Sequence, residues 1–156
     1  MDHEAFIREA IASARLAAEG AGGGPFGAVI VRDGIVIGRG RNGVTTCNDP
    51  TAHAEVAAIR DACARIQDYR LAGCVIYSSC EPCPMYLGAI YWARLGALYF
   101  AATRDDAAAI GFDDRRLYDE LPLPLNERSL PSTQLLREEA LPAFAAWHAD
   151  ATQTMY

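Results

Sequence analysis

The sequence of 156 residues predicts an α/β fold with a mixed sheet in a single domain, residues 1–156. Asp33-Gly34 lies between two β-branched runs, which predicts an antiparallel hairpin of strands 26–31 and 35–39. Between residues 52 and 101, helical and strand patterns alternate. That alternation predicts parallel βαβ units behind the hairpin. Neither repeats nor a low-complexity tail indicate a further domain.

Each element of the first half has its own signal. Apolar residues at helical spacing predict an amphipathic helix over 4–19, which the glycines within 20–24 end. The polar segment 42–51 predicts a loop. Its last residues, Asp49-Pro50-Thr51, offer helix caps, so a helix is expected from about residue 52 to residue 66.

The second half continues with short apolar runs and helix starts. The run 74–78 predicts a buried strand, and Pro82 suits the first turn of a helix over 83–92. A second buried strand is expected at 95–101. The remaining predicted elements are a short helix near 115–120, a proline-rich link at 122–131 and a last helix over about 138–150.

Charge and hydropathy narrow the class of function. The net charge is −6, and the longest basic cluster is Arg115-Arg116, directly after Asp113-Asp114. Because binding to a nucleic-acid backbone needs clustered cations, we expect a small-molecule substrate and no nucleic-acid partner. No apolar run has the length of a membrane span, and the N-terminus lacks a secretory pattern. We therefore expect no membrane partner and a cytoplasmic location.

The five cysteines are an odd number, which favours thiols or metal ligands over a disulfide framework. They are Cys47, Cys63, Cys74, Cys80 and Cys83.

Two short motifs indicate zinc chemistry. His53-Ala54-Glu55 stands at the expected start of one helix, and Pro82-Cys83 stands at the start of the next. Because a helix N-terminus stabilises negative charge, we expect a lowered pKa for the Cys83 thiol. A catalytic zinc takes three protein ligands and leaves one position for a water whose pKa it lowers. A nearby carboxylate that does not bind the metal then transfers the proton. The pattern H-x-E…P-C-x-x-C is typical of zinc nucleobase deaminases, with the glutamate as acid and base.

The second motif departs from that pattern, because position 86 is Tyr86 where a second cysteine would stand. Three alternatives follow. Cys80 supplies the missing thiolate through its own Cys-x-x-Cys spacing with Cys83, which is the alternative we favour. Alternatively, His53 and Cys83 hold zinc weakly, with Tyr86 or water completing the shell. In the third, the site holds no catalytic metal, and the chain is inactive or performs other chemistry.

Longer runs resemble bacterial guanine deaminases, which belong to the cytidine and deoxycytidylate deaminase-like zinc enzymes. The resemblance extends from Pro25 to Tyr156, and its most specific runs are 48–55, 79–85, 87–94 and 111–114. It implies a three-layer α-β-α sandwich of the cytidine deaminase kind with a five-stranded sheet. It also implies one zinc per subunit and a homodimer in which the C-terminal segment crosses to close the partner's site.

The same resemblance implies roles for individual residues. Glu55 would be the proton shuttle, and His53 and Cys83 would be zinc ligands. Glu139 matches a second acidic residue that orients or relays a proton. The residues implied in substrate binding are Phe26, Asn42, Ala54, Trp92, Asp114 and Tyr156. Ordinary structural roles stand beside these, such as a core position for Trp92, a solvated acid at Glu139 and a frayed end at Tyr156.

The leading functional prediction is hydrolytic deamination of guanine to xanthine and ammonia by zinc-activated water, with Glu55 as proton shuttle. Guanosine or an aminotriazine stays open as a substrate. One alternative is a repurposed or inactive homologue that binds a purine-like or triazine-like molecule without this chemistry. A tRNA adenosine deaminase shares the motifs but is expected to be more basic. A thiol nucleophile and a Cys80–Cys83 redox pair complete the alternatives.

Overall fold

The computed structural model describes residues 2–20 and 23–156. Its contacts divide the chain into two compact units, Met1–Arg115 and Arg116–Tyr156. The prediction of one domain over residues 1–156, with a C-terminal segment exchanged between subunits, stays a prediction. Within the described residues, no helix is both long and apolar enough to cross a membrane.

The first unit is built on a four-stranded sheet with the strand order β2-β1-β3-β4. β1 pairs antiparallel with both β2 and β3, and β3 pairs parallel with β4. The predicted hairpin and both predicted later strands are confirmed within a few residues, but only β3 is buried as predicted. β4 is the edge strand with no buried residue, and its Tyr99 and Phe100 are exposed. The strand bounds are Gly27–Arg32 for β1, Ile35–Arg41 for β2, Val75–Cys80 for β3 and Ala97–Ala102 for β4.

The hairpin turn has the backbone that its sequence predicts. Asp33 and Gly34 have φ values of 51° and 79°, both in the left-handed region. A two-residue turn of this kind matches the twist of the flanking strands and favours Asp-Gly.

The five-stranded sheet implied by the resemblance is corrected to four strands in the described chain. Residues 103–136 follow β4 and contain Pro122, Pro124 and Pro131, with no alternating apolar run. Since proline cannot donate to a ladder, this stretch supplies no fifth strand. It forms instead α5 (Arg104–Ala109), α6 (Arg115–Glu120) and the 3-10 helix η1 (Leu125–Glu127).

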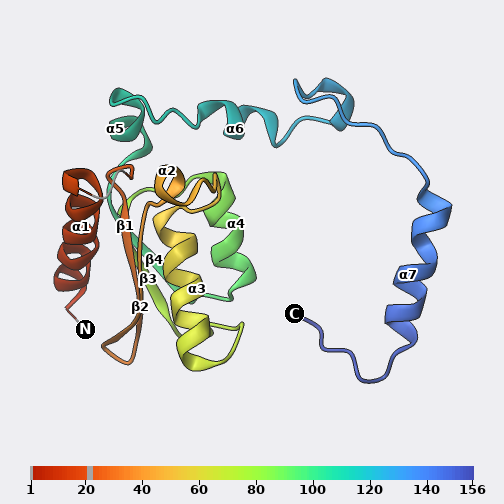
Figure 1. Cartoon of the computed structure of the whole chain (residues 1–156), viewed down its shortest axis with the longest axis horizontal. Coiled ribbons are helices and arrows are strands. Elements are labelled where there is room, and N and C mark those ends of the chain that lie inside the picture. The colour runs from red at the N-terminus through yellow and green to blue at the C-terminus, as the bar shows by residue number, and fades with distance from the viewer. Residues whose placement is uncertain (1, 21–22) are drawn as a thin grey trace. The chain divides into compact units, whose positions relative to one another are not determined.

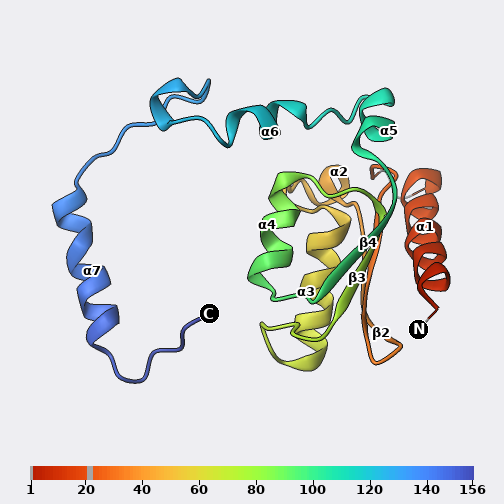
Figure 2. The same ribbon diagram turned by 180° about the vertical axis from the view of Figure 1, so that it is seen from behind.

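Helices cover both faces of the sheet, as Figures 1 and 2 show. α1 (His3–Gly20) lies on one face, and α3 (Ala54–Ile66) with α4 (Pro84–Trp92) lies on the other. Alternate residues of β1 supply the two cores. Ala28 and Ile30 join the cluster under α3 and α4, whereas Val29 and Val31 join the cluster under α1. The predicted three-layer α-β-α arrangement is therefore confirmed.

The close approach of α3 to β2 depends on two glycines. A Cβ added at Gly40 would lie 1.9 Å from the carbonyl oxygen of Ala54 and 2.4 Å from the amide nitrogen of Ala58. At Gly38 it would lie 2.5 Å from the carbonyl oxygen of Ala58. The helix meets this strand with Ala54, Ala58 and Ala62, all fully buried. Backbone therefore lies almost directly on backbone here.

Two short α-helices were not predicted, nor was the 3-10 helix η1 within the predicted proline-rich link. α2 (Val44–Cys47) lies inside the segment expected to be a loop, and α5 follows β4 directly. α5 had a sequence signal, because Thr103 and Asp106 form a capping box. The second unit contains η1 and α7 (Arg137–Ala149), which confirms the predicted last helix.

Replacing Gly40 with Ala is expected to lower the free energy of unfolding by roughly 3 kcal/mol, because the added methyl overlaps the α3 backbone. Gly88→Ala is the matched control, since Gly88 lies inside α4 and an added Cβ meets nothing within 4 Å. That variant should gain up to about 1 kcal/mol from helix propensity. Denaturant unfolding of both proteins measures the difference, and equal effects would contradict the close packing.

Candidate active site

Several elements of the first unit end or begin at the same edge of the sheet. Phe26 precedes β1, and Asn42 follows β2, where its amide donates to the Phe26 carbonyl at 3.0 Å. β3 ends at Cys80, beside the parallel strand β4. His53 and Cys83 are the N-cap residues of α3 and α4. The topology thus brings the predicted motifs to one place.

His53 and Cys83 face each other, with 3.7 Å between His53 Nδ1 and Cys83 Sγ. Neither side chain makes a capping hydrogen bond to its own helix. Burial lowers the pKa of His53, which favours the neutral imidazole that a metal needs. An ion bound at usual zinc distances of about 2.0 Å from nitrogen and about 2.3 Å from sulfur would separate these atoms by a similar distance.

The Cys83 thiol differs from the sequence-based prediction. A helix N-terminus was expected to lower its pKa. Burial instead raises the pKa of Cys83, and the backbone N–H groups of Tyr86 and Met85 offset this only in part. Desolvation outweighs the helix end here because Cys83 lies in the buried cluster under α3 and α4.

Glu55, the predicted proton shuttle, is a buried carboxyl group in this site. Its side chain is 1% exposed, and Ser78 Oγ on β3 donates to Glu55 Oε1 at 2.5 Å. Burial raises the pKa of Glu55 to about 7, with the Ser78 hydrogen bond acting in the opposite direction. A carboxyl group that titrates near neutral pH can both accept and return a proton. The predicted shuttle therefore has suitable surroundings, and Ser78 is a positioning residue that sequence reasoning missed.

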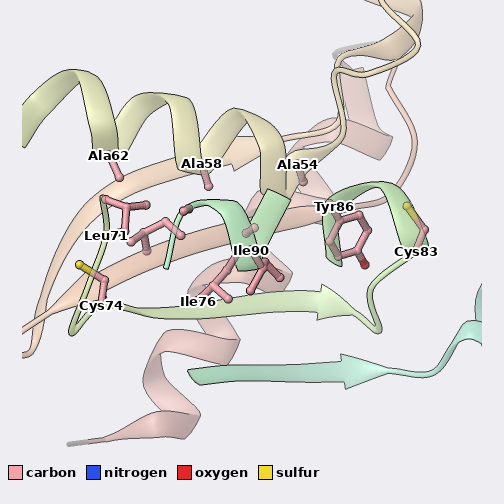
Figure 3. Close-up of a cluster of buried hydrophobic side chains, with 12 residues drawn as sticks. Ala54, Ala58, Ala62, Leu71, Cys74, Ile76, Cys83, Tyr86 and Ile90 are labelled. Atoms are coloured by element: carbon pink, nitrogen blue, oxygen red, sulfur yellow. The ribbon is translucent and has the colours of Figure 1, made fainter. Parts of the chain in front are cut away.

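Tyr86 takes the position where the motif would place a second cysteine. It is 4% exposed and lies in the buried cluster beside Ile90, as Figure 3 shows. Its hydroxyl donates to the carbonyl oxygen of Glu81 at 2.5 Å, with the Cys80 carbonyl oxygen at 3.4 Å. Burial raises the pKa of Tyr86. The phenol is thus a neutral hydrogen-bond donor to the loop before α4.

Cys80, the favoured third ligand, lines the pocket, but its Sγ donates to the Thr103 carbonyl oxygen at 3.5 Å. Burial raises the pKa of Cys80 to about 11, and the negative charge of Glu55 adds to this effect. Among residues 2–20 and 23–156, no three His, Cys, Asp or Glu side chains gather as a metal site would require. The His53–Cys83 pair therefore fits a zinc ion, whereas a three-ligand set is not assembled.

A pocket of about 620 Å³ opens over these groups. Phe26 and Phe112 form one wall, with ring centroids 4.9 Å apart and planes at 89°. The Asn42 side chain is held by its Oδ1, which accepts from the amides of Gly24 at 3.1 Å and Val44 at 3.2 Å. Partial burial raises the pKa of Asp114, which also lines the pocket. Polar and aromatic groups thus converge on one cavity, as in small-molecule sites.

The structure does not place every predicted residue in this pocket. Trp92, the last residue of α4, is 64% exposed and does not line it. Ala54 is fully buried against β2. Glu139 and Tyr156 belong to the second unit. The roles suggested for these four residues stay predictions.

Glu81, Arg104 and Phe112 are among the pocket residues that were not predicted as site residues. Phe112 belongs to a run that the resemblance singled out, and its aromatic side chain was the available signal. Arg104 lies on α5, the unpredicted helix, where its amide donates to Glu81 Oε2 at 3.1 Å.

Comparison with known proteins matches this geometry. A family model of the cytidine and deoxycytidylate deaminase zinc-binding region matches residues 1–102. Guanine deaminase from Bacillus subtilis (strain 168) is 52% identical, with 100% of both chains covered. The X-ray structure of guanine deaminase from B. subtilis superposes with a TM-score of 0.96 at 51% identity, covering 100% of this chain and 99% of that chain.

A second group of similar proteins matches about two thirds of the chain. A tRNA-specific adenosine deaminase from Aquifex aeolicus (strain VF5) is 40% identical over 102 residues, which are 65% of this chain and 67% of that protein. Similarity to the B. subtilis protein therefore continues through residues that this second match leaves uncovered.

In metal-free protein, Glu55→Gln is expected to raise the free energy of unfolding at pH 8 by up to about 3 kcal/mol. The folded-state pKa of Glu55, about 7, lies above the ordinary value of 4.5. Ionisation therefore penalises the folded wild type increasingly as pH rises from 4.5 to about 7. Below 4.5 both states hold the proton and the penalty vanishes. Denaturant titrations at pH 4 and pH 8 test this, and a difference independent of pH would contradict it.

Proposed function

We propose, from the premise that the chain belongs to the family of cytidine and deoxycytidylate deaminase zinc-binding proteins, that it hydrolyses guanine to xanthine and ammonia. The observation that supports this most is the full-length match to a guanine deaminase, at 52% identity. Water supplies the oxygen that replaces the amino group at C2 of the purine, and the amine leaves as ammonia.

Guanine binding is assigned to the polar and aromatic residues of the pocket. Because Asn42 Oδ1 is occupied by two backbone amides, its Nδ2 is the group that remains to donate to the carbonyl oxygen of the base. The Asp114 carboxyl group offers an acceptor to ring N–H groups. Phe26 packs on a face of the purine, and Phe112 holds the Phe26 ring at a right angle.

Proton transfer is assigned to Glu55. His53 and Cys83 would hold a zinc ion, and the chemistry that the ion would supply is a water with a lowered pKa. Glu55 takes the proton and delivers it to the leaving amine, because its pKa near neutrality allows both steps. Ser78 fixes the carboxyl group in one orientation from β3. Burial of both side chains keeps bulk water away from this transfer.

A homodimer is the assembly that we propose. No residue of α7 is buried, and this part of the described chain exposes apolar side chains. Such residues favour contact with another chain. They are Leu135, Leu136, Phe144, Trp147, Met155 and Tyr156. In this assembly Tyr156 caps the neighbouring subunit's pocket, Glu139 supplies a second acid and Trp92 contacts the substrate. We also propose a cytoplasmic location.

The first test is ammonia release from guanine by purified protein with added zinc. Glu55→Gln should reduce kcat by roughly 1,000-fold, because the proton relay is lost while the shape of the side chain is retained. Guanosine, an aminotriazine and a tRNA anticodon stem-loop are assayed beside guanine. Ammonia from one of these in place of guanine would reject the assigned substrate, and none from any would favour a binding protein.

Asn42→Asp separates substrate binding from folding. The aspartate keeps an oxygen for the Gly24 and Val44 amides but cannot donate as the Asn42 amide does. We expect KM for guanine to rise about tenfold or more, with little change in stability. Asn48→Asp adds the same charge at the exposed end of α2 and is the control. Equal KM changes in both variants would argue against a direct contact from Asn42.

A further inference from the structure

In the described chain, no third His, Cys, Asp or Glu side chain joins the His53–Cys83 pair to form a metal site. Tyr86 is the next candidate ligand, because it stands where the motif would place a cysteine. A phenol binds zinc as the phenolate, through the oxygen that loses its proton. Here the Tyr86 hydroxyl uses that proton to donate to the Glu81 carbonyl oxygen at 2.5 Å. Turning toward the metal would break this bond and leave a part-buried carbonyl unpaired. The Tyr86 hydroxyl lines the pocket as a neutral donor, and binding a metal as the phenolate would cost it this hydrogen bond.

Cys80 is engaged in a similar way. Its thiol is directed at the Thr103 carbonyl oxygen, next to the start of α5. Cys80 is also the last residue of β3 and pairs in register with Ala102 of β4. A ladder position of this kind fixes the Cys80 backbone, so the thiol could approach the His53–Cys83 pair only by a side-chain rotation that gives up the Thr103 contact.

We propose that the zinc centre of this chain has two protein ligands, His53 and Cys83, and that the ion exchanges readily with solution. Two coordination positions then remain for water or small exogenous ligands, whereas a three-ligand catalytic site leaves one. This inference deepens the proposed function, because it concerns the same site. It predicts metal behaviour that can be measured without substrate.

The geometry around Tyr86 suggests a variant that completes the set. Tyr86 lies three residues after Cys83 in the first turn of α4, and residues at that spacing lie on one side of a helix. Figure 3 shows the two side chains neighbouring each other at this helix start. Tyr86→Cys would place a second thiolate beside the first. Because loss of even an outer-shell partner weakens metal binding by about 10- to 100-fold, adding a direct ligand should increase zinc affinity by roughly 100-fold.

The test uses the full chain, stripped with a chelator and titrated with zinc against a chromophoric competitor. Cobalt(II) is titrated in parallel, because its thiolate charge-transfer absorption counts the bound cysteines. Wild-type protein should show one thiolate per cobalt and a zinc Kd about 100-fold weaker than that of Tyr86→Cys, which should show two thiolates. Tyr86→Phe and Cys80→Ser should keep the wild-type zinc Kd.

Three outcomes would overturn the proposal: two thiolates in the wild-type cobalt spectrum, a loss of zinc affinity in Tyr86→Phe or Cys80→Ser, or no metal binding by the wild type. The wild-type spectrum decides the ligand count even where a variant fails to fold, and circular dichroism monitors folding. Guanine turnover at saturating zinc is measured separately. A failed ligand count with normal turnover leaves the proposed function standing, and the reverse result leaves the metal centre standing.

Discussion

The contact between the backbones of α3 and β2 is the constraint on which the site depends. Gly38 and Gly40 leave no Cβ between the strand and the helix, so the turns at Ala54 and Ala58 lie directly on the sheet. The first turn of α3 carries Glu55, so this contact sets how deeply the carboxyl group is buried. A larger residue on the strand would move the whole helix, since packed backbone leaves no flexible side chain to yield.

Burial has opposite effects on neighbouring groups of the same pocket. It favours neutral imidazole at His53, and it raises the pKa of Glu55 so that the carboxyl group can accept and return a proton near neutral pH. It opposes a free thiolate at Cys83, which a metal ion would offset by its own charge. Burial therefore favours the neutral form of each of these three groups. Ser78 and Tyr86 are neutral groups whose hydrogen bonds to Glu55 partly offset the effect of burial on its pKa.

Local patterns predicted most elements, because turn chemistry and hydrophobic periodicity act over a few residues. Asp33-Gly34 predicted the hairpin, and His53-Ala54-Glu55 predicted a carboxyl group in the first turn of a helix. The direction of Cys80 could not be predicted in this way, because it depends on the pairing of β3 with β4 and on where α5 begins. The Cys83 pKa was missed for a related reason, since spacing reveals a helix end but not its depth of burial. The Thr103–Asp106 capping box is a local sequence signal from which the start of α5 could have been predicted.

The fit of Tyr86 has an evolutionary meaning. The phenol fills the buried cluster and pairs with the Glu81 carbonyl, so a change at this position need not disturb the packing of α4. Tyrosine and cysteine codons differ by one base at the second position. A lineage can therefore cross between the two residues in a single mutation while the scaffold stays intact. Selection on metal retention and selection on folding act separately at this residue. Metal binding can therefore change here while the fold is retained.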